Sequence, residues 1–330
     1  MLNSIQILRA IAALLVLFSH VIHKIIQKNF ENISSFDIGA SGVDLFFIIS
    51  GFIMCFTCEG KNITFVDFTK NRIIRIIPLY WILTTAALFI FLIKPELINS
   101  SGGDTSIIDS YFLLPSGEKF LIQNGWTLSY EFYFYFIFAL FLIFNINYYY
   151  KQVAVITTLL LLVVLGFFYE NKNPYILFTT NEIILEFCLG ILCYIFYKKF
   201  HLNNVIAFFL IAIGVILLFM FQHNVQLNLR SLYYGLPMTL IFIGFINLEN
   251  ILSKNKSIPL NFLKKIGDSS YSLYLVHPFV ISLTAIIFIK ANLSNYIIFF
   301  TITVLTSIII SYYIFKLIEL PTHNILKKFK

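Results

Sequence analysis

Apolar segments of roughly 17 to 22 residues recur along the whole chain, and this repetition constrains the fold more than any other feature. Each segment is long enough to cross a hydrocarbon core of about 30 Å. Apolar residues make up 59% of the chain and charged residues only 12%, whereas a soluble domain has about 25% charged residues. The sequence therefore predicts an all-α, polytopic membrane bundle, as a single domain over 1–330 with no appended soluble domain.

We expect about ten membrane-spanning helices, at 5–26, 42–57, 76–93, 126–144, 153–169, 181–197, 204–221, 232–248, 268–289 and 296–315. The second span is short unless the loop residues before it enter the membrane. The spans at 153–169 and 181–197 could instead be re-entrant segments. We do not expect the first span to be a cleavable signal, because it contains Arg9 and no small-x-small cleavage site follows it.

The distribution of lysine and arginine predicts the orientation of the bundle. If the N-terminus is cytoplasmic, 16 of these residues lie on the inner side and 7 on the outer side. The positive-inside rule then places both termini in the cytoplasm. Because topology explains the net charge of +7, the charge gives no reason to expect a nucleic-acid partner.

Two predicted loops are long enough to form structure of their own. The outer loop 94–125 mixes turn residues with apolar ones, and it is either a partly ordered connector or a lid that rests on the outer membrane face or covers a substrate. The inner loop 249–266 is basic, and we expect it to lie along the inner leaflet.

The cysteines indicate neither disulfides nor a metal site. None lies in a predicted external loop, so we expect no disulfide framework; the four residues are Cys55, Cys58, Cys188 and Cys193. The C-x-x-C spacing of residues 55–58 has no partner pair elsewhere.

Arginine is scarce, with 4 residues against 19 lysines, so its positions carry information. Arg9, Arg72 and Arg75 lie near predicted inner helix ends, and Arg72 and Arg75 share a helix face. A guanidinium group grips phosphate in two-point contact, which lysine cannot do. These arginines are therefore either topological anchors or ligands for a phosphorylated cytoplasmic molecule.

Acidic residues inside apolar spans are the next candidates. Asp44 begins the second span, and a pairing with His20 would orient the imidazole of a general base. Ser50 and Gly51 lie near the middle of that span, where small residues allow close helix packing. Glu131 lies about two turns into the fourth span, where it should face a polar cavity.

Arg9 and His20 share one stripe of the first span. They are eleven residues, or about 16 Å, apart along a helix. This spacing predicts a path through the bundle, with a cationic entry and a titratable group beyond it. His23 is either a second site or an interfacial residue. We expect no metal site, because no other histidines cluster with these two.

The segment GDSSYSLYLVHPF, residues 267–279, places His277 in the middle of the ninth span. A buried histidine of this kind is commonly structural, yet we assign His277 and Tyr274 to the donor-binding set with the arginines. The sequence IELP is expected to end the last span, where Glu319 could pair with a basic residue of the inner face.

Taken in order, these motifs resemble the membrane-bound acyltransferase 3 family. The resemblance covers essentially the whole chain. It rests on Arg-x10-His in the first span, GVDLFFIISGF, RIIRIIPLYW, WTLSYEFYFY, the late GDSSYSLYLVHPF and the final IELP. The N-terminal sequence is most similar to the branch of exopolysaccharide acetyltransferases.

The resemblance implies an O-acetyltransferase of the bacterial inner membrane. Acetyl-CoA would be the cytoplasmic donor, held by Arg72 and Arg75, and a sugar hydroxyl of a polysaccharide or lipid-linked glycan would be the acceptor. His20 would be the catalytic residue, either as base or as acyl carrier, and Arg9 its spaced partner. Catalytic roles for Asp44, Glu131 and Ser50 follow only as candidates.

Several alternatives stay open from the sequence. The acyl group could be one other than acetyl, the acceptor could be a lipid or small molecule, or the chain could be a multi-span transporter. The expected partners are the acyl donor, the acceptor and membrane lipids. The sequence leaves the oligomeric state open, with a homo-oligomer among the alternatives.

Overall fold

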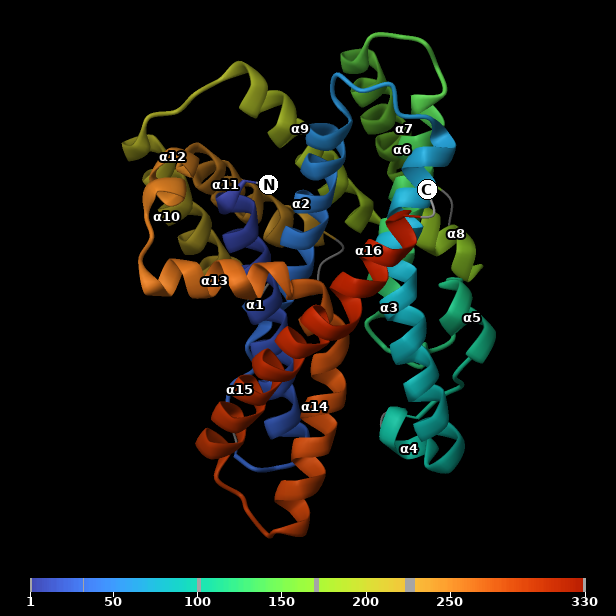
Figure 1. Cartoon of the computed structure of the whole chain (residues 1–330), viewed down its shortest axis with the longest axis vertical. Coiled ribbons are helices and arrows are strands. Elements are labelled where there is room, and N and C mark those ends of the chain that lie inside the picture. The colour runs from blue at the N-terminus through green and yellow to red at the C-terminus, as the bar shows by residue number, and fades with distance from the viewer. Residues whose placement is uncertain (1, 32, 100–101, 169–171, 223–228, 329–330) are drawn as a thin grey trace.

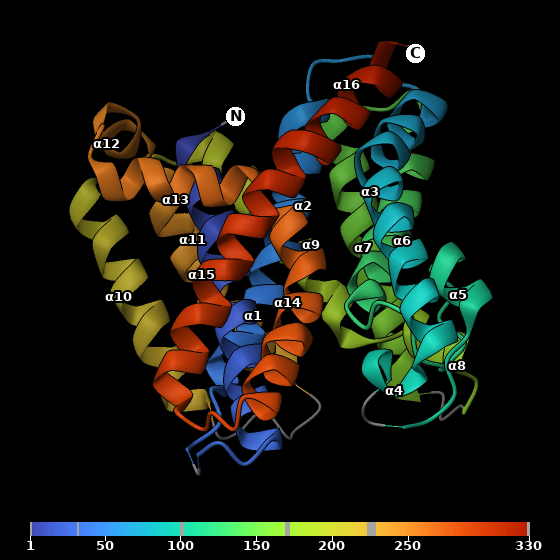
Figure 2. The same cartoon turned by 60° about the horizontal axis from the view of Figure 1, so that its bottom comes forward.

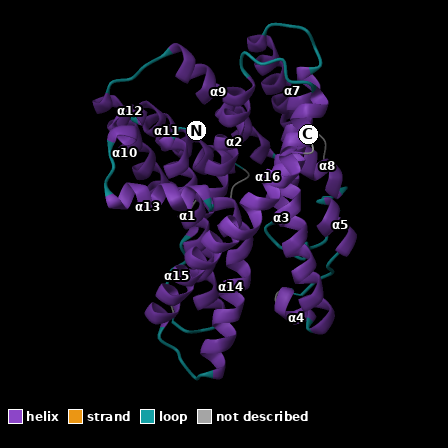
Figure 3. Ribbon diagram, viewed as in Figure 1, coloured by secondary structure: helices purple, strands orange, loops and turns teal. Residues whose placement is uncertain are grey.

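The structure is a computed structural model that describes residues 2–328, except 32, 100–101, 169–171 and 223–228. The described chain is built from helices, with one isolated β-bridge between Thr105 and Lys119 (Figures 1 and 3). The first ten α-helices are α1 (Asn3–Gln27), α2 (Ser41–Cys58), α3 (Phe65–Ile93), α4 (Pro95–Ile98), α5 (Ile107–Phe112), α6 (Gly125–Leu142), α7 (Tyr148–Phe168), α8 (Pro174–Thr179), α9 (Leu185–Lys199) and α10 (Asn204–Phe221).

The remaining α-helices are α11 (Leu236–Asn247), α12 (Glu249–Lys254), α13 (Ile258–Asp268), α14 (Ser270–Lys290), α15 (Tyr296–Ile314) and α16 (Leu320–Lys328). Short 3-10 turns precede α2 and α9, and π-helical turns precede α11 and α16; these are η1 (Asp37–Ala40), η2 (Glu182–Ile184), η3 (Ser231–Gly235) and η4 (Phe315–Glu319).

The predicted all-α membrane bundle is confirmed. Within the described residues, eight helical segments are long and apolar enough to cross a membrane. The helix α6 and the shorter apolar segment Ser231–Asn247 account for the other two predicted spans. Both termini lie at the same end of the bundle, with α12, α13 and α16 (Figure 2). We call this end the termini face.

Three boundaries differ from the prediction. The helix α3 begins at Phe65, eleven residues before the predicted span, because the Thr64 side chain caps its first turn by accepting from the Asp67 amide. The second span is not short, because η1 extends α2. The helix of the last span does not end at IELP. The helical path continues through η4 into α16.

The two segments that could have been re-entrant form helices long enough to cross a membrane. The helix α7 has 21 residues, and Pro174–Lys199 has 26. Residue 169, the predicted end of the fifth span, lies outside the described residues. The basic inner loop forms α12 and α13, and α13 packs against α1.

The helix α2 lies at the centre of the bundle. In its most apolar window 89% of residues are buried, against 17% in α10 at the periphery. The backbones of α2 and α9 approach closely at Gly51 and Gly190. A Cβ atom on Gly190 would lie 3.0 Å from the Gly51 Cα and 2.9 Å from the Phe52 amide nitrogen. Glycine at both positions is therefore what allows α9 to cover α2, as small residues do in membrane helix pairs.

Candidate active site

A cavity of about 100 Å³ lies between α1, α2, α3, α6 and α14, and we call it the arginine cavity. Its polar lining comes from five elements that are distant in sequence; the members used below are Arg9, Ser50, Arg75, Thr127, Glu131, Tyr135 and Tyr274. Because Arg9 lies in the first half of α1 and Arg75 in the first half of α3, this cavity is on the side of the termini face.

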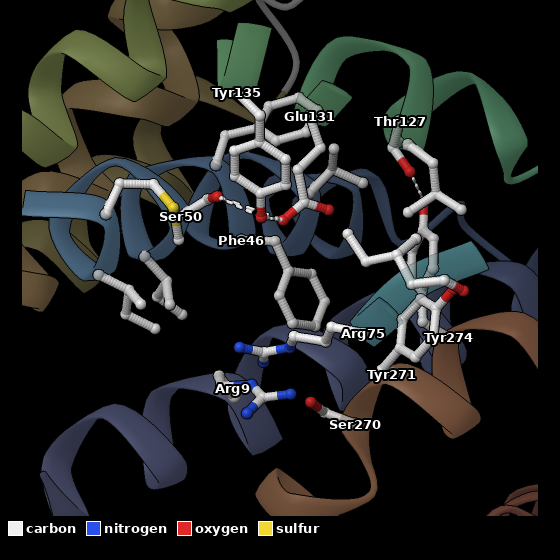
Figure 4. A pocket seen from close by; sticks show the side chains of 17 residues that line it. Arg9, Phe46, Ser50, Arg75, Thr127, Glu131, Tyr135, Ser270, Tyr271 and Tyr274 are labelled. Carbon is white, nitrogen blue, oxygen red and sulfur yellow. Dashed lines mark hydrogen bonds between the residues drawn. The ribbon is translucent and has the colours of Figure 1, made fainter. Parts of the chain in front are cut away.

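Figure 4 shows the guanidinium groups of Arg9 and Arg75 beside each other at one side of the cavity. Arg9 is only 8% exposed, and it donates to the Gln6 side chain at 3.3 Å. In the described part of the chain, neither arginine forms an ion pair with a carboxylate. Two neighbouring guanidinium groups that form no direct ion pair with a carboxylate favour the binding of an anion, and guanidinium groups suit phosphate.

The other side of the cavity carries a hydrogen-bonded group of three side chains (Figure 4). Ser50 Oγ donates to Glu131 Oε1 at 3.2 Å, and the Tyr135 hydroxyl donates to the same oxygen. Ser50 Oγ also lies 3.2 Å from the Tyr135 hydroxyl. Glu131 therefore does face a polar cavity, as the sequence predicts, and it places a carboxylate beside Ser50.

Arg72 does not line the arginine cavity, although the sequence pairs it with Arg75. Its guanidinium group lies over the rings of Phe68 and Tyr135, with centroids at 5.5 and 5.8 Å. Its Nε and Nη1 atoms are buried without a hydrogen-bond partner among the described residues. Unpaired buried donors of this kind are compatible with a phosphate ligand close by.

A second cavity, of about 650 Å³, lies between α1 and α14 on one side and α3, α4 and residues 121–124 on the other. We call it the histidine cavity, because His20 and His23 line it with Lys24. These residues are in the last third of α1, so this cavity is on the side opposite the termini face. The predicted separation of Arg9 and His20 along one helix thus corresponds to two cavities.

The long loop 94–125 contributes to the histidine cavity and is ordered where it is described. The Tyr80 hydroxyl on α3 donates to the Ser110 carbonyl at 2.6 Å, and the Trp81 indole donates to the Tyr111 carbonyl at 3.0 Å. Leu97, Ile98 and residues 121–124 form part of the cavity wall. These segments are therefore ordered and form part of a cavity wall, and the choice between a connector and a lid stays a prediction.

His20 pairs with His277 and not with Asp44. The Nδ1 atom of His20 lies 2.8 Å from Nε2 of His277, and the ring centroids are 5.0 Å apart. The predicted pairing of His20 with Asp44 is wrong. Asp44 is fully buried and makes a two-point ion pair with Arg230, at 3.0 Å from Nε and 2.7 Å from Nη2.

A thin polar layer separates the two cavities. Tyr274 and Thr127 line the arginine cavity, and Asn124 lines the histidine cavity. The Thr127 hydroxyl lies 2.8 Å from the Tyr274 hydroxyl and donates to the Asn124 carbonyl at 2.9 Å. Asn124 in turn lies 3.4 Å from His277 Nε2. A group bound in the arginine cavity is therefore one layer of side chains away from the His20–His277 pair.

Other predicted residues have different partners. Glu319 accepts from Ser272 at 2.5 Å and forms no ion pair with a described basic residue. The four cysteines are free and buried. No group of metal-ligating side chains occurs in the described ranges.

Sequence reasoning missed Arg230, Tyr135 and Asn124. The scarcity of arginine could have identified Arg230, but it falls between the predicted spans 204–221 and 232–248 and counts there only toward the charge of the outer side. Tyr135 follows Glu131 by one helical turn, which a search for hydrogen-bond partners at i+4 would have found. Asn124 precedes α6 and carries no pattern of its own.

Comparison with known proteins agrees with this architecture. The acyltransferase 3 family, described as an acyltransferase domain, matches residues 2–316. The exopolysaccharide production protein ExoZ of Rhizobium meliloti (strain 1021) is 32% identical over 267 residues, which cover 76% of this chain and 79% of ExoZ.

The O-acetyltransferase OatA of Staphylococcus aureus is 23% identical over 317 residues, which cover 86% of this chain and 52% of OatA. The chain thus spans about half the length of that relative. No solved structure gives a significant match. The family match decides against the transporter alternative, and the chain belongs to the acyltransferase 3 family as a multi-pass membrane acyltransferase.

Proposed function

We propose that this protein transfers an acetyl group from cytoplasmic acetyl-CoA to a sugar hydroxyl of a surface polysaccharide or lipid-linked glycan. One observation carries the proposal: an arginine-lined cavity and a histidine-lined cavity approach each other from opposite sides of the bundle. The glycan acceptor and the acetyl group are supported by the names of the relatives, one an exopolysaccharide production protein and the other an O-acetyltransferase.

The donor site in this proposal is the arginine cavity. Arg9 and Arg75 hold phosphate groups of CoA on the termini face, and the unpaired Arg72 contributes close by. The termini face is then cytoplasmic, as the positive-inside rule favours, and the protein belongs to a bacterial inner membrane. The acyl-bearing arm extends past Tyr274 and Thr127 toward His20, so that CoA itself does not cross the membrane.

The acceptor site is the histidine cavity, and His20 is the general base. His20 takes the proton of the sugar hydroxyl while the hydroxyl oxygen attacks the thioester carbonyl carbon. The carbon–sulfur bond breaks, and the CoA thiolate takes the proton from His20. In the alternative route, His20 attacks the thioester itself and carries the acetyl group as an acyl-imidazole.

The test uses the native organism with this gene deleted, complemented by wild type or His20→Ala at matched membrane levels. Proton NMR of the purified surface polysaccharide, before and after mild alkali, reports O-acetyl methyl groups. We expect these signals with wild type only, because loss of a general base lowers the rate by about 10²- to 10⁴-fold. Identical spectra from the deletion strain and the wild-type complement would exclude that glycan as the acceptor. O-acetylation by His20→Ala at the wild-type level would exclude the role of His20.

A further inference from the structure

The hydrogen bonds around the His20–His277 contact indicate which ring nitrogen atoms carry protons. His277 is 1% exposed, and its Nδ1 atom lies 2.9 Å from the carbonyl oxygen of Leu273, one turn earlier in α14. A carbonyl oxygen can only accept a hydrogen bond. The proton of the His277 ring is therefore on Nδ1.

Two polar nitrogen atoms lie close to the other nitrogen of His277. Asn124 Nδ2 lies 2.9 Å from the Tyr274 carbonyl, which identifies that atom as the amide nitrogen, and 3.4 Å from His277 Nε2. His20 Nδ1 approaches the same Nε2 atom at 2.8 Å. An amide nitrogen can only donate, so Nε2 of His277 is an acceptor, and with its one ring proton on Nδ1 His277 is a neutral ring.

The tautomer of His20 follows from this chain of contacts. Because His277 Nε2 accepts, His20 Nδ1 carries the proton and donates it. In neutral His20, the Nε2 atom then holds the basic lone pair. His20 lines the histidine cavity and His277 does not, so Nε2 is the nitrogen left for a ligand there.

On the basis of the proposed function, we infer that His277 is a positioning residue that fixes the tautomer of His20 and makes Nε2 its reactive nitrogen. His277 thus takes the place that a carboxylate would take in a dyad, and Asp44 is unavailable because Arg230 engages it. It orients the base without adding a negative charge. This role replaces the donor contact that the sequence assigned to His277.

The test compares His277→Leu, which removes the acceptor, with His277→Gln, whose side-chain oxygen can accept from His20 Nδ1. Purified full-length protein in nanodiscs is assayed with acetyl-CoA and the de-O-acetylated native polysaccharide. We expect His277→Leu to lower kcat about 10- to 100-fold, as loss of an orienting partner does elsewhere, with the KM for acetyl-CoA unchanged. His277→Gln should recover part of kcat.

A pH profile separates positioning from folding. The groups that bear on His20 are His23 and Lys24 on α1, Asn124 before α6 and His277 on α14. With His277→Leu, the limb of the kcat profile that reports the base should move, whereas His201→Leu, at an exposed turn, should leave it in place. Thermal unfolding in the same nanodiscs confirms that each variant is folded.

The outcomes distinguish this inference from the proposed function. Wild-type kcat in His277→Leu, together with an inactive His20→Ala, would overturn the positioning role only. A raised KM for acetyl-CoA with unchanged kcat would return His277 to donor binding. Full activity of His20→Ala would overturn the proposed function itself.

A separate observation concerns the charge of the histidine cavity. Its described lining includes Lys24 and His23 and no acidic side chain. Lys24 Nζ donates to the neutral Gln27 side chain at 2.9 Å and forms no ion pair with a described carboxylate. Lys24 follows His20 by four residues, so it lies about 6 Å further along the same helix face.

Again on the basis of the proposed function, we infer that the acceptor carries an anionic group, a carboxylate or phosphate, that binds Lys24 about one helical turn from the reacting hydroxyl. Such a group could belong to the sugar or to the phosphate of a lipid carrier. Lys24→Gln is compared with Lys28→Gln, since Lys28 lies one turn further on and does not line the cavity. We expect Lys24→Gln alone to raise the acceptor KM about tenfold, as loss of one charge-assisted hydrogen bond would.

Two acceptors, each assayed with wild type and Lys24→Gln, identify the source of the negative charge. A lipid-free oligosaccharide with a uronic acid reports a sugar carboxylate, and a neutral sugar on polyprenyl phosphate reports a carrier phosphate. Greater sensitivity of one acceptor to Lys24→Gln assigns the anion to that source. Equal acceptor KM values for Lys24→Gln and Lys28→Gln would overturn the inference, with no bearing on the activity of His20.

Discussion

Asp44 and Arg230 are 186 residues apart and form a two-point ion pair, with Nε–Oδ1 at 3.0 Å and Nη2–Oδ2 at 2.7 Å. The Asp44 side chain is fully buried, while that of Arg230 is 26% exposed. Arg230 Nη2 also donates to the Ala40 carbonyl at 3.1 Å. The pair therefore joins the start of α2 to the start of the η3–α11 helix.

We expect this ion pair to contribute to the stability of the folded protein more than to catalysis. We expect Asp44→Asn to destabilise the protein by about 3–5 kcal/mol, because the largely buried Arg230 side chain loses its two-point partner. The double variant Asp44→Asn with Arg230→Gln should recover part of this loss. Thermal unfolding in detergent measures both. Full stability of Asp44→Asn combined with loss of transfer activity would instead return Asp44 to a catalytic role.

The arginine cavity predicts a binding defect. Arg75→Ala should raise the KM for acetyl-CoA about 10- to 100-fold, since a hydrogen bond to a charged group contributes about 1.5–3 kcal/mol and 1.4 kcal/mol corresponds to tenfold. Arg75→Lys should recover little, because lysine makes no two-point contact. Isothermal titration with CoA provides the binding constant. Lys70→Ala, five residues earlier on the same helix, is the control for loss of a nearby positive charge. An equal loss of CoA affinity in Lys70→Ala would show that Arg75 acts only through general charge.

The helices were predictable from sequence, whereas their partners were not. Hydrophobic length identifies spans because a bilayer requires about 20 apolar residues for each. The pairings His20–His277 and Asp44–Arg230 join residues 257 and 186 positions apart. No local pattern encodes such contacts, since they depend on how the helices are arranged around α2. The same limit explains why Arg72 and Arg75, which are neighbours on one helix, have different environments.

The glycine contact between α2 and α9 predicts a packing defect. Gly190→Leu should destabilise the bundle by several kcal/mol, because its Cβ alone would lie 3.0 Å from the Gly51 Cα and further atoms add to the strain. Gly60→Leu is not a suitable control, because Gly60 has a positive φ of 68°. Leu192→Ala, at an exposed position of α9, should have little effect in the same unfolding assay. Wild-type stability of Gly190→Leu would show that α9 can move away from α2.

Substitution of Ser50 tests whether the acetyl group is bound covalently to the protein before its transfer. Ser50 lies between Ile49 and Gly51 in the sequence, with no base beside it, but in the structure its hydroxyl donates to Glu131 at 3.2 Å. A serine beside a carboxylate is a candidate nucleophile. Direct transfer through His20 nevertheless predicts that Ser50→Ala keeps activity within about tenfold of wild type, the effect of losing one hydrogen bond to a charged group.

The decisive measurement is acetyl transfer to the protein in the absence of acceptor. Full-length wild type is incubated with acetyl-CoA that carries a radiolabelled acetyl group, denatured and examined for bound label. Direct transfer predicts none. Label that is present in wild type and absent in Ser50→Ala would place an acyl-serine intermediate in the arginine cavity, and His20 would then act only on the second half of the reaction. Label that persists in Ser50→Ala and is lost in His20→Ala would instead identify the acyl-imidazole route, so each pattern corresponds to one mechanism.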